Sequence, residues 1–405
     1  MNKKTAVALA VGAMFAAPAL AQSNVQIYGK FYPQFGSFKS SGATLPGGAP
    51  ATLVPNPTAG NANNHERRNN IETSNSYIGF RGDEKLGGSL ALIWQMEQAL
   101  SFDAPGEFWA NRNSFIGLRG AFGTVKLGNM DTIYKEYGDQ FSMMGLNSGN
   151  FTSGSNALSH IGLGNSGAAR FHERRESSLQ YETPEFGNFT FGIQYGPDET
   201  KGNPGTTTDA SLWSYGVKYE SDRLYVSVHQ ERHNDFFGAS NNIAAAFSNL
   251  DAGGDPLPGA DSKDTGTRLS VAFKLTKEHT LTADIAQLEY KESGPGLFEK
   301  YERRNIAVGW EARWGGGPVR TGIQFIKMNE GDCELTTGAA CSTEGLDGRM
   351  LNLGAAYDLS RRTFLFALFS KLKNGESARF DNWPGGSPAR GADTTQMAAG
   401  IQHRF

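Results

Sequence analysis

The sequence predicts an all-β fold, a sixteen-stranded antiparallel transmembrane β-barrel. Three observations carry this prediction. Segments of about ten residues alternate apolar and polar side chains. Short and long links between these segments follow one another in turn. Beyond residue 21 there is no long apolar run, and the mean hydropathy of the chain is −0.44. A barrel can be this polar because only every second residue of a strand faces lipid.

Residues 1–21 are set apart from this fold. Lys3 and Lys4 form a basic start, Ala6–Ala17 is apolar, and Ala19–Ala21 is an A-x-A cleavage site. This pattern is that of a secretory signal peptide, so residues 22–405 are expected to be the exported barrel. The apolar run is too short to be a transmembrane helix.

Sixteen segments show the alternation expected of strands. In one of them Trp213 and Tyr215 oppose Ser214, and in the next Val228 opposes Ser227. One segment fits poorly, because residues 364–369 are apolar on both faces, which suggests a packed wall. The sixteen segments are 24–36, 73–82, 88–100, 110–120, 123–132, 174–183, 188–196, 211–220, 223–232, 266–276, 279–290, 301–313, 318–329, 348–358, 362–373 and 394–405.

The links between these segments alternate in length. Tight turns are expected at 83–85, 120–123, 184–187, 221–222, 277–278, 315–318 and 360–361. Longer links are expected at 37–72, 101–109, 133–173, 197–210, 233–265, 291–300, 330–347 and 374–393. A closed barrel in the outer membrane has short periplasmic turns and long outer loops, and this places both chain ends on the periplasmic side.

The composition suits a barrel and excludes several other classes. The chain has 51 Gly, 26 Phe and 13 Tyr, which suit turns and the aromatic girdles at the membrane interfaces. Loss of Lys3 and Lys4 takes the net charge from −3 to −5, too mild to indicate a nucleic-acid partner. No cofactor is expected, because the GxGxxG at 162–167 lies in a long link with no helical pattern after it.

No metal site is expected either. His229, Glu231 and His233 would share one face of a strand, but the two histidines would lie about 13 Å apart. They are therefore expected to be polar residues of the inner face or the rim. Cys333 and Cys341 are predicted to form a disulfide that closes a small outer loop in an oxidising compartment. A redox or metal pair is disfavoured because no His or third Cys lies nearby.

Five short motifs, in order along the chain, resemble the general porins of Gram-negative bacteria, most closely those of Neisseria and Burkholderia relatives. They are VQIYG at 25–29, SYIGFRGDEKLGG at 76–88, SFIGLRGAFGTVKLG at 114–128, YETPEF at 181–186 and GIQHRF at 400–405. The resemblance implies a non-enzymatic, water-filled channel for passive diffusion of small polar solutes and ions. It also implies a homotrimer in the outer membrane, in contact with lipid and lipopolysaccharide. A last strand ending in Phe405 looks like the signal that the barrel-assembly machinery recognises.

The resemblance further implies a constriction formed by an infolded third outer loop, here 133–173. Glu136 and Asp139 lie early in this loop. The wall facing it should carry bases, and the family motifs together with the alternation indicate Lys30, Arg112, and either Arg174 or Arg175. Counting back from the lipid-facing residues of that strand makes Arg174 the inward one. Acids opposite bases across a narrow gap would filter ions.

Tyr77 departs from the family pattern, because some porins have Arg at this inward place. The basic cluster is therefore expected to be thinner, with mild anion preference or near neutrality. Two other functions remain open from sequence alone. One is an outer-membrane barrel hydrolase, which needs a nucleophile and a base facing lipid. The other is a structural or adhesive surface barrel with a plugged lumen. Bilayer conductance separates the porin from both.

Overall fold

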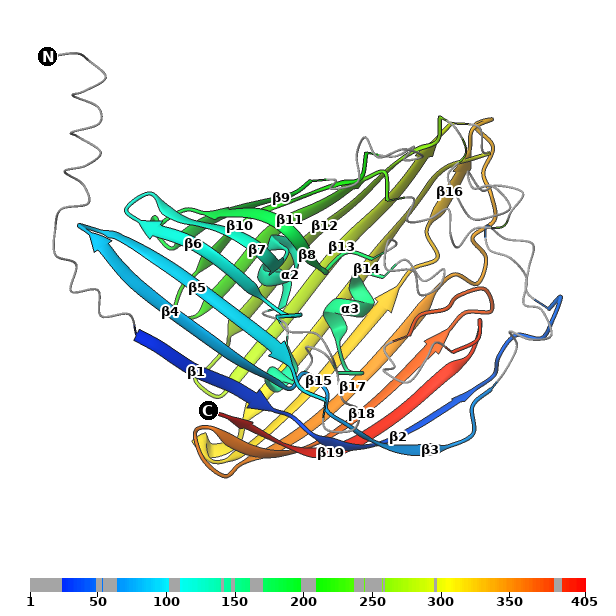
Figure 1. Cartoon of the computed structure of the whole chain (residues 1–405). Helices are drawn as coiled ribbons and strands as arrows, with labels where there is room; N and C mark the ends of the chain where they lie inside the picture. Colours follow the sequence, from blue (N-terminus) through cyan, green and yellow to red (C-terminus); the bar gives the residue numbers. More distant parts are fainter. Residues whose placement is uncertain are drawn as a thin grey trace, which may run out of the picture.

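The computed structural model describes residues 24–48, 53, 64–101, 110–139, 142–146, 150–160, 170–197, 209–236, 244, 257, 259–294, 297–381 and 388–405. The predicted signal peptide at 1–21 and the GxGxxG at 162–167 lie outside these ranges. Nineteen strands form one continuous antiparallel sheet (Figure 1).

The strands, in chain order, are β1 Asn24–Phe31, β2 Gln34–Ser41, β3 Arg68–Glu72, β4 Tyr77–Gly87, β5 Leu90–Ala99, β6 Ser114–Gly120, β7 Gly123–Asp131, β8 Arg174–Glu182, β9 Phe189–Gly196, β10 Ser211–Glu220, β11 Leu224–Asn234, β12 Asp261–Lys274, β13 His279–Ser293, β14 Phe298–Arg313, β15 Val319–Met328, β16 Asp332–Leu335, β17 Gly348–Asp358, β18 Thr363–Asn374 and β19 Asp393–Arg404. Three short helices, α2 Ile133–Gly138, η2 Met143–Gly145 and α3 Gly154–Leu158, lie between β7 and β8, and a fourth, η5 Trp314–Gly316, forms the turn before β15.

These nineteen strands make sixteen crossings, as predicted. β1 and β2 are halves of one crossing, interrupted at Tyr32 and Pro33. β3 and β4 are halves of the next crossing, since β2 pairs with β3 while β1 pairs with β4. β16 is a short extension that pairs only with β14 among the described strands. The first two crossings therefore reach further than the expected 24–36 and 73–82.

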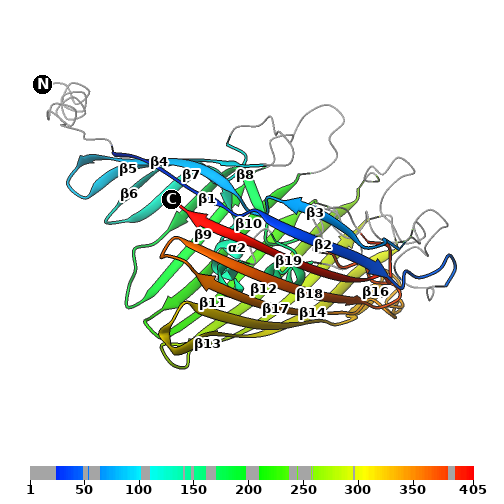
Figure 2. The ribbon, with the colours of Figure 1, turned by 90° about the horizontal axis from the view of Figure 1, so that it is seen from below.

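The barrel closes where the two chain ends meet. β19 pairs with β2 along its length and with β1 at its end, where Lys30 lies opposite Arg404 (Figure 2). Beyond this pair, the backbone amides and carbonyls of Gly29 and Phe405 bond to each other at 3.2 Å in both directions. A Cβ on Gly29 would meet the Phe405 ring at 2.5 Å, so this position requires glycine. Closure leaves no unpaired edge in the lipid.

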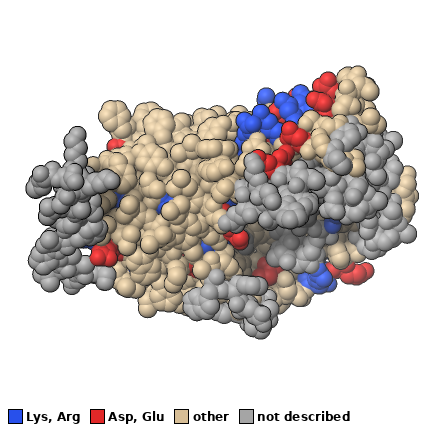
Figure 3. All heavy atoms as spheres, turned by 45° about the horizontal axis from the view of Figure 1, so that its top comes forward, with Lys and Arg blue, Asp and Glu red and all other residues tan. Residues whose placement is uncertain are grey.

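Apolar side chains point outward and polar side chains point inward, as the alternation in the sequence predicts. On β11 the side chain of Val228 is 47% exposed, whereas Ser227 and His229 are buried. On β10 Trp213 and Tyr215 are exposed and Ser214 is buried. Outside the barrel is thus apolar and inside is polar. Figure 3 shows the result on one face, where the middle of the wall is nearly free of charged side chains.

One predicted turn is wrong. The sequence places it at 83–85, but β4 continues through these residues in register with β5, with Asp83 opposite Ile93. The turn lies at Gly87 and Gly88, whose φ angles are 120° and 56°. Only glycine adopts such angles freely, so the two glycines rather than the charged residues set the end of the hairpin.

The link between β15 and β17 contains a disulfide that joins Cys333 and Cys341, with their Cα atoms 5.1 Å apart. Cys333 lies on β16, and its carbonyl accepts a hydrogen bond from the amide of Cys341 at 3.1 Å. The disulfide therefore ties the short β16 to the segment that follows it. Within the described ranges, no helix is long and apolar enough to cross a membrane.

Candidate functional site: the loop-lined channel

The helices α2 and α3, which belong to the described part of the segment between β7 and β8, lie inside the barrel (Figure 1). Helix α2 packs against the inner faces of β9–β12, and α3 packs against those of β14 and β15. The short helix η2 packs against β14, β15 and β17. Thr132 caps α2 and Ser153 caps α3, each accepting from the backbone amide three residues on. Helices this short gain little from propensity, so contacts with the wall must hold them.

Polar side chains of the wall bond directly to the backbone of this loop. Three amide or hydroxyl groups donate to loop carbonyls: Tyr225 to Tyr137 at 2.8 Å, Asn305 to Leu158 at 2.8 Å and Asn352 to Thr152 at 2.9 Å. From the first crossing, Tyr32 donates to Leu146 at 2.9 Å. In the other direction the amide of Tyr134 donates to Ser214 at 2.8 Å. These contacts satisfy backbone groups that a buried loop would otherwise leave unpaired.

A buried ion pair anchors the middle of the loop. Arg268 on β12 and Asp284 on β13 are both fully buried, and the guanidinium donates to the carboxylate at 2.7 and 2.9 Å. The same guanidinium donates to the carbonyl of Gly138 at 3.0 Å and to the hydroxyl of Ser155 at 3.1 Å. One arginine, whose charge is balanced by Asp284, therefore ties both α2 and α3 to the wall.

An apolar cluster anchors the part of the loop between α2 and α3, and it explains the strand that fitted the alternation poorly. Phe364, Phe366 and Leu368 on β18 are buried and belong to one core cluster with Met143 and Met144 of η2. The inner face of this strand is apolar because it packs against the loop rather than facing water. The packed wall suggested by the sequence is thus a contact between wall and loop.

Lys30 on β1, Tyr77 on β4 and Arg112, just before β6, come together on one part of the wall. The Lys30 ammonium lies 5.6 Å from the centre of the Tyr77 ring, and the Arg112 guanidinium lies 4.8 Å from it. Tyr77 therefore separates two cations and attracts both through its ring face. Tyr77, which stands where some porins have an arginine, therefore contacts both bases with its ring.

Glu97 on β5 completes this cluster. One carboxylate oxygen lies 3.6 Å from Nε of Arg112, and the other accepts from the Tyr28 hydroxyl at 2.9 Å. The basic wall thus contains an acid of its own, which the sequence analysis missed. The signal was available, because Glu97 lies on the same face as Gln95 and Ile93, opposite the exposed Met96.

The two candidate arginines of β8 point to different neighbours. Arg174 pairs with Asp131 at 2.9 Å and donates to Asn113 at 2.8 Å. Arg175 packs over the Phe236 ring at 5.2 Å. A bulge in the β7–β8 pairing, with Ser177 at a φ of 49°, shifts the alternation between these arginines and the rest of the strand. A count from the lipid-facing residues therefore does not carry across it.

The two loop acids interact with different bases, and for Asp139 these are chiefly His172, Lys135 and Arg268. Lys30 lies within electrostatic range of Asp139 and Arg112. Glu136 instead has Lys126 and Lys218 as its basic neighbours, and its burial raises the pKa of its carboxyl. Of the two acids, Asp139 is the one within electrostatic range of Lys30.

Asp139 is held ionised. Burial alone would raise the pKa of its carboxyl, but the charge and the hydrogen bond of His172 outweigh burial and hold that pKa well below its ordinary value. Nε2 of His172 lies 2.6 Å from the Asp139 carboxylate. The acid on the loop thus keeps its negative charge across the physiological pH range.

The three residues that look like metal ligands lie on the inner face of β11. His229, Glu231 and His233 are all buried, and Nε2 of His233 lies 3.1 Å from the Glu231 carboxylate. His229 packs edge-on against the ring of Tyr134 in α2. The two histidines thus contact the segment between β7 and β8 through Tyr134 and Phe171. Among the described residues no group of three His, Cys, Asp or Glu could hold a metal ion.

Known proteins of similar sequence and fold share this architecture. A family model described as Gram-negative porin matches residues 6–377. The major outer membrane protein P.IB of Neisseria lactamica is 30% identical over 223 residues, which are 55% of this chain and 57% of that protein. P.IB of Neisseria gonorrhoeae is 29% identical over 223 residues, 55% of each chain. The chain therefore spans little more than half the length of these curated relatives.

Solved structures match over nearly the whole chain. The anion-selective porin from Comamonas acidovorans is 19% identical with a TM-score of 0.68, covering 95% of this chain and 100% of that one. The trimer form of OmpT from Vibrio cholerae is 16% identical with a TM-score of 0.62, covering 95% and 99%. At these identities the likeness shows the fold, a closed sixteen-stranded barrel.

Proposed function

The chain belongs to the Gram-negative porin family, and we propose that it forms a water-filled channel in the bacterial outer membrane through which small polar solutes and ions diffuse passively. The observation that carries this proposal is the polar inner face of a closed sixteen-stranded barrel, too wide for its side chains alone to fill. The loop narrows this lumen on one side, and the Lys30–Tyr77–Arg112 cluster lines the other.

Passive diffusion makes a specific prediction for solute entry. Liposomes that contain the folded protein should swell in neutral sugars at rates that rise linearly with concentration and fall steeply with sugar size. A water-filled gap has no saturable step, so no plateau is expected. Saturation at low millimolar sugar, or no swelling above that of empty liposomes, would contradict the proposal.

The constriction that we propose consists of Lys30, Tyr77 and Arg112 on the wall and Asp139 on the loop. Arg174 contributes at its edge, within electrostatic range of Arg112. Glu136 and Arg175 stand further from this gap and contribute through the general field. Because Glu97 and Asp131 offset part of the basic charge, we expect mild anion preference or near neutrality.

We also propose that the protein is a homotrimer. An apolar outer hollow of about 550 Å³ lies on β2, β17, β18 and β19, where Ala355, Ala367 and Ala399 are flanked by larger side chains. Small residues allow close approach of a second barrel in lipid. The trimer should survive extraction in mild detergent and migrate at three times the mass of the heat-denatured chain. A monodisperse monomer after gentle extraction would be evidence against it.

The resemblance to porins also suggests how the protein is exported and assembled. We propose that residues 1–21 are removed as a signal peptide, which the intact mass of the isolated protein would show. We propose that the barrel-assembly machinery recognises the last strand with Phe405, and that the finished wall contacts lipid and lipopolysaccharide. In the folded barrel the Phe405 ring packs against Phe31 at 5.0 Å between ring centres, so the same residue also closes the barrel.

A further inference from the structure

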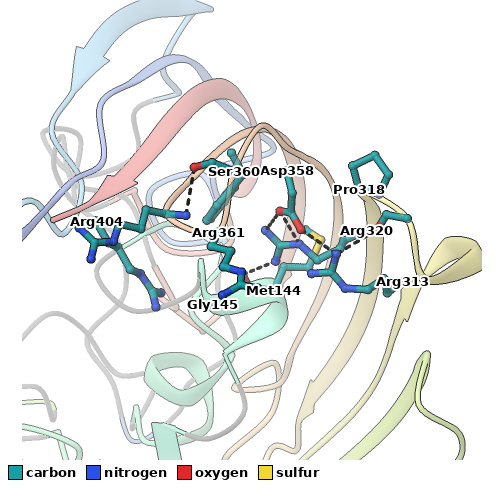
Figure 4. Close-up of a pocket in the computed structure, with 13 residues that line it drawn as sticks. Met144, Gly145, Arg313, Pro318, Arg320, Asp358, Ser360, Arg361 and Arg404 are labelled. Carbon is teal, nitrogen blue, oxygen red and sulfur yellow. Dashed lines mark hydrogen bonds and ion pairs between the residues drawn. The ribbon is translucent and has the colours of Figure 1, made fainter.

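A second cluster of arginines lies away from the constriction, at the end of the barrel that carries the tight turns. It surrounds a cavity of about 770 Å³ between the turn before β15, the turn between β17 and β18, and the end of β19. Five arginines line this arginine pocket: Arg313, Arg320, Arg361, Arg362 and Arg404. Figure 4 shows Arg404 on one side of it and Arg313 and Arg320 on the other. The loop closes its floor with Met144 and Gly145.

The charges in the arginine pocket do not cancel. Asp358 is the acid among the lining residues, and it is already shared. One of its oxygens accepts from Nε and Nη2 of Arg320 at 3.0 and 2.8 Å, and the other lies 2.8 Å from Nη1 of Arg313. Within the described residues no carboxylate lies within 4.0 Å of the guanidinium groups of Arg361, Arg362 or Arg404. The lining therefore carries a formal charge of about +4.

Two further acids lie near the lining, and within the described residues neither forms an ion pair with its arginines. Glu278 is one of them, with Oε1 3.7 Å from a Cβ built on Gly316. Glu311 on β14 lies below the floor, where its carboxylate accepts from the amide of Met144 at 2.8 Å. Arg320 also donates to the carbonyl of Met144 at 3.1 Å, so loop and pocket share one hydrogen-bonded floor. Two of the five arginines are thus fixed in place by Asp358 and the loop, which preorganises that side of the pocket.

We propose that the arginine pocket binds a doubly charged tetrahedral oxyanion, presented by free phosphate or by a phosphate monoester. Guanidinium groups match such anions because their planar N–H forks donate two hydrogen bonds to adjacent oxygens. Chloride carries one charge and offers no such pair of acceptors. A cavity of this size lies within the usual range for small-molecule sites and accommodates phosphate with its water or a small ester.

The arginine pocket lies on the path of the solute, so it would add solute binding to passive diffusion. Arg320 and Asp358 lie on strand faces that point inward, beside the buried Gly322 and Ala356, so the site opens to the lumen rather than to lipid. It stands at the periplasmic end of the path that a solute takes past the loop. A phosphate-bearing solute would therefore be concentrated at the exit of the channel.

Calorimetric titration of the detergent-folded protein with inorganic phosphate, at constant ionic strength set with chloride, tests the site without requiring conduction. We expect saturable binding, and we expect Arg361→Gln/Arg362→Gln to weaken it by about tenfold or more, since charge-assisted hydrogen bonds are lost. Arg223→Gln/Lys274→Gln is the matched control, because it also removes two exposed positive charges at a tight turn of the same end, outside the pocket. Glycerol 3-phosphate should bind similarly if monoesters are recognised, and only free phosphate should bind if the site encloses the whole ion.

Three outcomes would overturn the proposal: no saturable binding by the parent protein, equal weakening by the control and the double variant, or equal affinity for chloride. If the double variant does not fold, Arg404→Gln serves as the second variant with the same expectation. Phosphate binding by a protein that does not conduct would contradict the porin proposal and leave the site intact. Conduction without phosphate binding would do the reverse.

Discussion

Replacing Arg112 by Ser should shift the reversal potential of the channel toward cation preference. Arg112 is packed over the Tyr77 ring. In the constriction that we propose, its charge would be screened less than a charge at the rim. Its removal also leaves Glu97 without its basic partner, which adds negative field to the gap. Under a tenfold KCl gradient the shift should be a sizeable part of the about 59 mV that perfect selectivity allows.

The control for this measurement is Arg67→Ser. Arg67 is exposed in the link before β3, so the same change in charge takes place in open water. Its effect on the reversal potential should be much smaller at physiological salt, where screening acts within about 8 Å. If the two variants shift the potential equally, the constriction is not where we propose it, even though the barrel remains.

Replacing Arg268 by Met should both destabilise the barrel and loosen the loop. The substitution leaves the buried Asp284 without its partner, which costs about 3–5 kcal/mol of unfolding free energy. It also removes the hydrogen bonds to Gly138 and Ser155 that hold α2 and α3 against the wall. Denaturant titration should show the loss of stability, and single-channel recordings should show greater current noise.

A second variant separates these two effects. Arg268→Met combined with Asp284→Leu removes both charges, so most of the stability should return while the loop contacts stay absent. We expect near-parent stability with persistent noise. Arg304→Met, on β14 two strands away from Arg268 and with its side chain exposed, should change neither. A quiet channel in both Arg268 variants would mean that this arginine does not hold the loop.

The strands could be predicted from the sequence because the lipid imposes a period of two on every crossing. The prediction failed where that constraint ends. Asp83, Glu84 and Lys85 lie beyond the apolar band and are polar on both faces, so their continuation of β4 leaves no alternating signal. The extension of β3 beside β2 was missed for the same reason.

The site could be predicted only in part, because its geometry depends on contacts that alternation does not encode. Lys30, Tyr77 and Arg112 were placed on one wall by resemblance and face, and they meet there. Arg174 could not be oriented, because nothing in the sequence marks the bulge at Ser177. The apolar inner face of β18 correctly indicated a packed wall. Its partner could not be predicted, because the sequence does not show that Met143 and Met144 of the loop cover it.

Planar bilayer conductance of the purified, folded protein shows whether the barrel is an open, water-filled pore. We expect stable, wide channels whose current is linear in voltage at both polarities, because a polar lumen narrowed by a fixed loop holds continuous water. A sample that is folded, as judged by heat-modified mobility, yet leaves the bilayer without channels would contradict this expectation. That result would favour a barrel hydrolase or a structural surface barrel over a porin.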